Sequence, residues 1–169
     1  TLNSYGAAEI IAPCIQPVGL WQKSGRFNDD NELKADMLLM EDRHHHQLFF
    51  TPSAEETVTD MLASSLHSYK NLPLNLYQIN WKFRDEIRPR FGVLRAREFF
   101  MKDGYSFHKD EACAEKMYEK MLQCYLDVFA KIGITAIPVT ADTGAMGGKF
   151  SHEFHVLADT GESSIFYQP

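Results

Sequence analysis

The sequence has 169 residues, 44% hydrophobic and 24% charged, enough to bury the core of one globular domain but not of two. Its net charge of −6 argues against nonspecific coating of nucleic acid, and no apolar run reaches the ~20 residues that a membrane span needs. Three cysteines without a CxxC pair favour a reduced, cytoplasmic protein.

The first predicted elements are short. Residues 9–12 predict a strand, residues 27–46 a polar loop with a helical or hairpin excursion, and residues 47–50 a second strand. Ser53 is then the expected N-cap of a helix, because it stands three residues before Glu56 and apolar residues follow at helical spacing.

The middle of the chain predicts a long β-hairpin. Apolar and polar residues alternate from Leu76 to Phe83, and a return strand runs from about Arg97 to Phe107. Between Lys82 and Arg97, six basic residues stand against two acidic ones, which indicates a localised anionic ligand rather than a long duplex.

The last third predicts the longest helix, from Asp110 as its N-cap to about Ile132. Short strands are expected at 135–139, 152–157 and 164–167. Because the order is βαββαββ with hairpin pairing, we expect an antiparallel α+β domain.

Strand alternation groups candidate ligand-binding side chains on one face of the hairpin. Arg84 and Glu86 are expected opposite the apolar face of the first strand. On the return strand, five side chains share a face: Arg97, Phe99, Met101, Asp103 and Tyr105. Arginine suits a phosphate, an aromatic ring a base, and a carboxylate an ammonium group. The same pattern also fits a solvated face with cross-strand ion pairs.

The hairpin resembles motif 2 of the class II aminoacyl-tRNA synthetases, through FRDE at 83–86 and RAREF at 95–99. The bacterial-type prolyl-tRNA synthetases are similar over further blocks, which keep the family order along nearly the whole chain: 21–26, 52–56, 68–73, 82–107, 147–148 and 151–154.

The resemblance implies the class II catalytic fold, an antiparallel sheet flanked by helices. Residues 1–169 would form part of one such domain, with motif 1 near 6–17, motif 2 near 82–103, and Pro13 at a dimer interface. Motif 3 and the anticodon-binding domain would lie outside this chain. We therefore expect the chain alone to be inactive in adenylate formation.

The implied activity is proline–tRNA ligation. L-proline reacts with ATP and Mg²⁺ to give prolyl-adenylate, and the prolyl group passes to the 3′ end of tRNA(Pro), in a cytoplasmic homodimer without membrane attachment. The implied catalytic residues are Arg84 and Glu86. The implied ATP-binding residues are Arg84, Glu86, Arg95, Arg97 and Phe99. The implied proline-binding residues are Ser53, Glu55, Arg84, Met101, Asp103 and Tyr105, and no protein ligand to a metal is expected.

Within these sets, the resemblance implies that Arg84 binds the α-phosphate, Phe99 stacks on the purine and Glu55 meets the ammonium group of proline. Ser53 stands where the family usually has threonine, and Thr51 stands where glycine is common. Three alternatives remain: another class II synthetase of the threonyl or seryl type, a non-catalytic synthetase-like accessory or RNA-binding protein, and a metal-binding module built on the histidines at 44–46.

Overall fold

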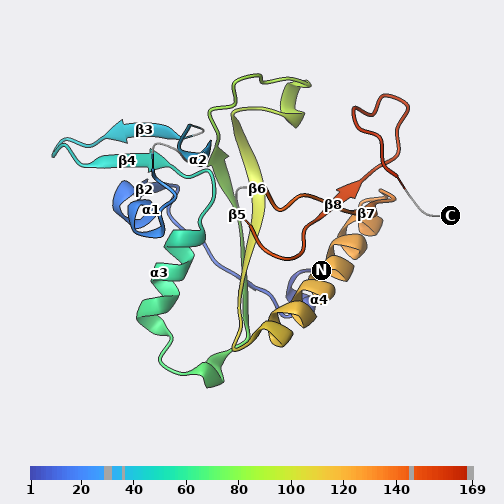
Figure 1. Cartoon of the computed structure of the whole chain (residues 1–169), viewed down its shortest axis with the longest axis horizontal. Helices are drawn as coiled ribbons and strands as arrows, with labels where there is room; N and C mark the ends of the chain where they lie inside the picture. The colour runs from blue at the N-terminus through green and yellow to red at the C-terminus, as the bar shows by residue number, and fades with distance from the viewer. Residues whose placement is uncertain (29–31, 36, 145–146, 167–169) are drawn as a thin grey trace. The chain divides into compact units, whose positions relative to one another are not determined.

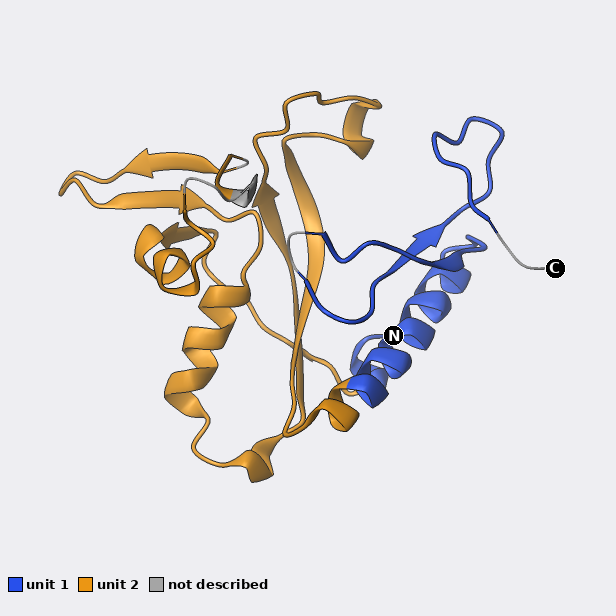
Figure 2. Ribbon diagram, viewed as in Figure 1, with its two compact units in different colours: residues 1–5, 115–169 blue, residues 6–114 orange. Residues whose placement is uncertain are grey.

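A computed structural model describes residues 1–28, 32–35, 37–144 and 147–166 (Figure 1). The chain divides into two compact units, which are residues 1–5 with 115–169 (unit 1) and residues 6–114 (unit 2) (Figure 2). The predicted α+β class is confirmed. Within the described residues the strand pairs are antiparallel, except for the parallel pair β1–β5.

Unit 2 is built on the predicted hairpin. Strands β5 (Leu74–Phe83) and β6 (Glu98–Phe107) pair along their whole length, and β1 (Ala8–Glu9) adds a short edge beside β5. Their connection contains the 3-10 turn η3 (Gly92–Leu94). The structure therefore confirms the alternation seen in the sequence and extends the first strand by two residues.

The two faces of β5 differ in burial. Gln78 and Lys82, on the polar face, are buried, whereas Ile79 and Trp81, on the apolar face, are 47% and 48% exposed. A polar strand face is ordinarily the solvated one. In this hairpin it is covered, so its polar groups need partners inside the protein.

A second sheet of unit 2 has the order β2-β4-β3, with bounds Ile15–Pro17, Gln47–Phe50 and Leu38–Glu41. Helix α1 (Val18–Ser24) packs Trp21 edge-on against Phe49, with ring centroids 5.2 Å apart. The predicted strand at 47–50 is confirmed, and the predicted polar segment 27–46 contains the short helix α2 (Glu32–Ala35) and β3.

Helix α3 (Glu55–Ser65) begins later than predicted. Ser53 is not its N-cap: the cap position is Ala54, whose side chain cannot accept a hydrogen bond. Glu55 and Glu56 occupy the first turn, where their charge is favourable to the helix dipole. Ala54 and Val58 join a buried apolar cluster, so packing of this end outweighs side-chain capping. The 3-10 turn η2 (Tyr69–Asn71) leads into β5.

Unit 1 holds most of helix α4 (Glu111–Lys131), the turn η1 (Asn3–Tyr5), and the antiparallel strands β7 (Ile137–Thr140) and β8 (His152–His155). The predicted cap is confirmed, because the Asp110 Oδ1 atom accepts the Cys113 N–H at 2.8 Å. Phe154 lies 5.5 Å from the ring centroids of Tyr125 and Phe129.

The strand predicted at 164–167 is wrong for residues 164–166, and residue 167 lies outside the described residues. No helix in the described part of the chain is both long and apolar enough to cross a bilayer.

Candidate active site

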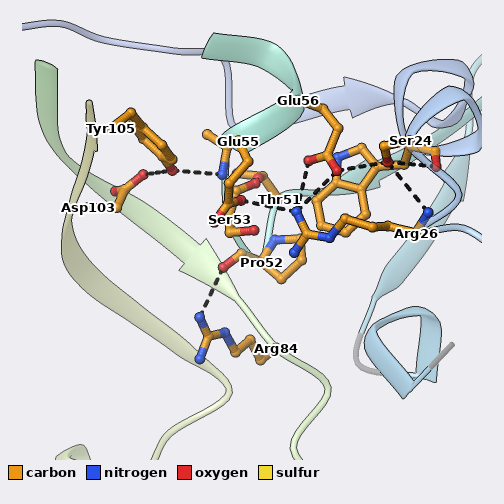
Figure 3. A network of polar contacts seen from close by, with 12 residues as sticks. Ser24, Arg26, Thr51, Pro52, Ser53, Glu55, Glu56, Arg84, Asp103 and Tyr105 are labelled. Carbon is orange, nitrogen blue, oxygen red and sulfur yellow. Dashed lines mark hydrogen bonds and ion pairs between the residues drawn. The ribbon is translucent and has the colours of Figure 1, made fainter. Parts of the chain in front are cut away.

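Several polar groups of unit 2 converge on residues 51–56, which run from the end of β4 into the first turn of α3 and which we call the site loop (Figure 3). Its backbone is tied to the hairpin where β5 ends, since the Thr51 carbonyl accepts the Phe83 N–H at 3.3 Å. Arg84 Nη2 donates to the Pro52 carbonyl at 3.3 Å. Both strands hold the site loop, because the Ala54 N–H donates to the Tyr105 hydroxyl of β6 at 2.8 Å.

Arg26 binds the two glutamates at the end of the site loop (Figure 3). Its Nη1 atom lies 3.1 Å from both carboxylate oxygens of Glu56 and 3.3 Å from Glu55 Oε2. The guanidinium also lies over the Trp21 ring, 4.3 Å from its centroid, and Ser24 Oγ donates to Glu56 at 2.9 Å. Both carboxylate oxygens of Glu56 thus contact Arg26, whereas only the Oε2 atom of Glu55 does.

Asp103 and Tyr105, both predicted proline-binding residues, are brought together with the site loop. Asp103 Oδ1 lies 2.9 Å from Lys82 Nζ, and its Oδ2 accepts hydrogen bonds from Gln78 Nε2, at 2.8 Å, and from the Tyr105 hydroxyl. Burial, then the hydrogen bond to Asp103, then the charge of Glu55 raise the pKa of Tyr105, so its phenol stays protonated. Met101 is half-buried on the same strand face.

Two predicted ATP-binding residues also lie together. The Arg84 guanidinium lies over the Phe99 ring, 5.6 Å from its centroid, and the Arg84 side chain is exposed. An exposed cation therefore adjoins the site loop at Pro52, and a half-buried aromatic ring lies beside that cation.

The other three predicted ATP-binding residues form a separate cluster at the hairpin tip. Arg95 Nε lies 2.9 Å from Glu86 Oε2, and Arg97 pairs with Asp85. The hydrogen bond from Arg95, followed by that from the Arg88 N–H, lowers the pKa of Glu86. An open cavity of about 460 Å³ adjoins this cluster, lined by Ala35, Asp85, Glu86, Ile87, Pro89 and Arg97.

Strand alternation misplaced Arg97. Its guanidinium lies 5.2 Å from the centroid of Phe83, a residue of the alternating apolar face of β5, and its ion-pair partner is Asp85. The reason is that β6 begins at Glu98, so the alternation does not extend to Arg97. Glu86 likewise lies beyond the end of β5 at Phe83.

Sequence reasoning missed Arg26 and Lys82 as site residues. For Arg26 the available signal was the family-like block 21–26, to which no role had been attached. For Lys82 the available signal was the position of a lysine on the same strand face as Gln78. The histidines at 44–46 lie in the exposed β3–β4 turn, where His46 contacts Asp42 at 3.0 Å. Within the ranges that the structure describes, no three metal-ligating side chains converge.

Known proteins are similar to this chain over most of its length. Residues 38–167 match the family described as tRNA synthetase class II core domain (G, H, P, S and T). Curated relatives named proline–tRNA ligase, from Rickettsia akari (strain Hartford) and Ehrlichia ruminantium (strain Gardel), are 54% and 51% identical over 166 residues, or 98% of this chain. The chain spans 38% of the length of each.

Two solved structures share the fold. Giardia lamblia prolyl-tRNA synthetase in complex with prolyl-adenylate matches 82% of this chain and 29% of its own, with a TM-score of 0.73 and 19% identity. A structure described as the RNA binding domain of threonyl-tRNA synthetase from Cryptosporidium parvum Iowa II matches 81% of this chain and 33% of its own, with a TM-score of 0.68 and 21% identity. With the family match over residues 38–167, these findings show that the chain belongs to the class II tRNA synthetase core-domain family.

Proposed function

We propose that this chain is part of a proline–tRNA ligase, which activates L-proline with ATP and transfers the prolyl group to the 3′ end of tRNA(Pro). The observation that carries the proposal is the site loop. It presents Glu55, an acceptor for an ammonium group, and it is bound at Pro52 by Arg84, a donor for a phosphate. The 54% identity to a curated proline–tRNA ligase supports proline over other amino acids.

The amino-acid side of the site is formed by the site loop and β6. Glu55 Oε1 has no hydrogen-bond or ion-pair partner among the described residues, so one carboxylate oxygen is available to the proline ammonium. The Ser53 hydroxyl would lie beside it. The remaining proline-binding residues of the proposal are Met101, Asp103 and Tyr105.

The ATP side is formed by Arg84 and Phe99. Arg84 would bind the α-phosphate and the carboxylate side of the adenylate, while Phe99 would stack on the purine. Glu86 would face adenine, and Arg95 or Arg97 would bind phosphate or the tRNA acceptor end. The pair of Arg97 with Asp85 is exposed and that of Arg95 with Glu86 is partly exposed, and exchange of such ion pairs for a ligand costs little free energy.

The reaction has two displacement steps. A proline carboxylate oxygen attacks the α-phosphorus of ATP, and the bond to the bridging oxygen of the β-phosphate breaks to release pyrophosphate. A terminal ribose hydroxyl of tRNA then attacks the prolyl carbonyl, loses its proton, and AMP leaves. Arg84 stabilises charge on the α-phosphate oxygens, so this chain contributes positioning and electrostatics rather than a covalent nucleophile.

Mg²⁺ enters this proposal as part of the ATP complex and is assigned no protein ligand. The protein would act in the cytoplasm as a homodimer through the motif 1 region, residues 6–17. Pro13 supports this assignment, because it is exposed in the connection between β1 and β2.

The test uses a hybrid enzyme, the Rickettsia akari ligase in which this chain replaces the matching 166 residues. We expect the hybrid to catalyse ATP–pyrophosphate exchange that depends on proline and not on threonine or serine. The unmodified Rickettsia enzyme is the positive control, and this chain alone is the negative control. Circular dichroism and thermal melting establish that the hybrid is folded.

A folded hybrid that exchanges with threonine or serine instead of proline would refute the amino-acid assignment. A folded hybrid without any exchange would refute the catalytic assignment in favour of a non-catalytic synthetase-like protein. If the hybrid does not fold, calorimetric binding of a sulfamoyl analogue of prolyl-adenylate to this chain replaces the assay. Absence of binding would then refute the proposal.

A further inference from the structure

We propose that Lys82 is a positioning residue: its buried ammonium holds the Asp103 carboxylate in place, and Asp103 orients the Tyr105 hydroxyl that binds the site loop. The four groups form one chain of contacts, from the Lys82 ammonium through Asp103 and Tyr105 to the Ala54 N–H (Figure 3 shows its last two contacts). The consequence for proline recognition rests on the proposed function, whereas the chain of contacts does not.

The Lys82 ammonium is completely buried, and in the described part of the chain its one polar contact is Asp103, at 2.9 Å. An unpaired ammonium in this position would lose its hydration without compensation, at a cost of several kcal/mol. The stable arrangement therefore keeps the Lys82 ammonium against the Asp103 carboxylate. A lysine on this strand face thus fixes the position of that carboxylate.

The charge of Asp103 determines the direction of the next hydrogen bond. An ionised carboxylate only accepts, so the Tyr105 hydroxyl must donate its proton to Asp103. The lone pairs of the phenol oxygen are then directed away from Asp103 and can accept the Ala54 N–H at 2.8 Å.

The Ala54 N–H is the group through which the site loop is bound to β6. Ala54 is fully buried at the start of α3, between Ser53 and Glu55, and has no side-chain polar group of its own. Its backbone hydrogen bond to Tyr105 therefore sets where the flanking hydroxyl and carboxylate stand relative to β6. Movement of this peptide by a fraction of an ångström changes the geometry for the proline ammonium.

Amide hydrogen exchange in this chain, measured by NMR, tests the contacts without an activity assay. Lys82→Met keeps the length of the side chain and removes its charge, and Tyr105→Phe removes only the hydroxyl. In each variant we expect the Ala54 amide to exchange about 10-fold faster, the loss expected for one hydrogen bond. The reference is the Ile10 amide, which donates to the Tyr77 carbonyl at 2.8 Å within unit 2.

The double variant Lys82→Met/Tyr105→Phe separates positioning from general destabilisation. Because both residues act through the same hydrogen bond, Ala54 should exchange no faster in the double variant than in Tyr105→Phe. Lys116→Met, at an exposed position of α4, is the matched control and should leave both amides unchanged. An Ala54 amide that is unchanged in Lys82→Met, or that accelerates only in parallel with Ile10, would overturn the proposal.

The catalytic consequence is measured in the hybrid enzyme. Lys82→Met should raise the proline KM about 10-fold and leave the ATP KM within about 2-fold, because the site loop contacts the amino acid and not the purine. Equal changes in both KM values would overturn the positioning role. Failure of the proposed function is a separate outcome: the unmodified hybrid would then lack proline-dependent exchange, whatever the Ala54 amide shows.

Discussion

The β5–β6 hairpin holds ion pairs in two settings. Within its strands, Lys82 forms an ion pair with Asp103, and the two side chains are 0% and 10% exposed. At its tip, Arg97 and Asp85 pair with side chains that are 49% and 43% exposed. The two pairs are three residues apart on the first arm of the hairpin, from Lys82 to Asp85, and six on the second, from Arg97 to Asp103. Burial is therefore the principal difference between them.

Burial decides what each pair can do. A buried pair is strongly coupled to the fold, because separating its partners leaves an unsolvated charge. An exposed pair is screened by water and salt, so its partners exchange easily for ligand groups. The buried pair is therefore suited to fixing the site loop, and the exposed pair at the tip is suited to exchanging its partners, as the proposed phosphate binding requires.

The strongest test of this contrast is the stability of Asp103→Leu. The variant leaves the Lys82 ammonium buried and unpaired, so we expect a loss of ~3–5 kcal/mol in the free energy of unfolding. Both tryptophans, Trp21 and Trp81, lie in unit 2, so urea titration with tryptophan fluorescence measures it. Lys82→Met/Asp103→Leu, which removes both charges, should regain most of the loss. If the free energy of unfolding of Asp103→Leu lies within ~1 kcal/mol of wild type, this pair is not coupled to the fold.

Arg84 stands between Lys82 and Asp85 in the sequence, and its replacement should have the next largest effect. In the hybrid enzyme, Arg84→Ala should reduce proline-dependent ATP–pyrophosphate exchange by at least ~100-fold, the scale of losing a charge-stabilising donor. Arg43→Ala, at an exposed position in the β3–β4 turn, is the control. Near wild-type exchange in Arg84→Ala would remove Arg84 from the proposed site.

Glu55→Gln tests the carboxylate at the end of the site loop. The amide keeps the shape but removes the charge, so the proline KM should rise ~10- to 150-fold, which corresponds to a charge-assisted hydrogen bond of ~1.5–3 kcal/mol. The ATP KM should change much less. Glu56→Gln is the matched variant, because Arg26 engages both oxygens of Glu56. Similar changes in both KM values would identify Glu55 as structural.

At the tip, Asp85→Asn should have a small effect. The pair with Arg97 is exposed, so the free energy of unfolding should change by no more than ~1 kcal/mol, and less at high salt. Urea titration at low and high ionic strength gives both values. A loss of unfolding free energy as large as that of Asp103→Leu would show that the buried and the exposed ion pair do not differ in their coupling to the fold.

The smallest expected effect is the pH dependence of Glu86. Its pKa is lowered in the folded state by the hydrogen bond from Arg95, so its stabilising contribution is complete above the ordinary carboxyl pKa and is lost as the pH falls through the lowered value. In Arg95→Gln the Glu86 pKa should rise toward its ordinary value, which an NMR titration of the carboxylate measures. An unchanged pKa would show that the pair does not persist in solution.

The elements that the sequence predicted correctly are those whose cause is local. Alternation from Leu76 to Phe83 identified β5, and a carboxylate at Asp110 identified the start of α4. Ser53 failed as an N-cap although its spacing was right, because burial of Ala54 sets the first turn of α3 one residue further on. Local signals name an element well but its ends less well, since packing decides which residue enters the core.

For the candidate site, the sequence by itself determined which residue types stand on the proposed ligand-binding face of β6: Phe99, Met101, Asp103 and Tyr105 follow from a period of two. Only the tertiary structure decided their partners. Arg26 reaches Glu55 and Glu56 across some thirty residues of sequence, and Lys82 reaches Asp103 across the hairpin. Charge pairs of this kind depend on distance and dielectric, and both quantities exist only once the chain is folded.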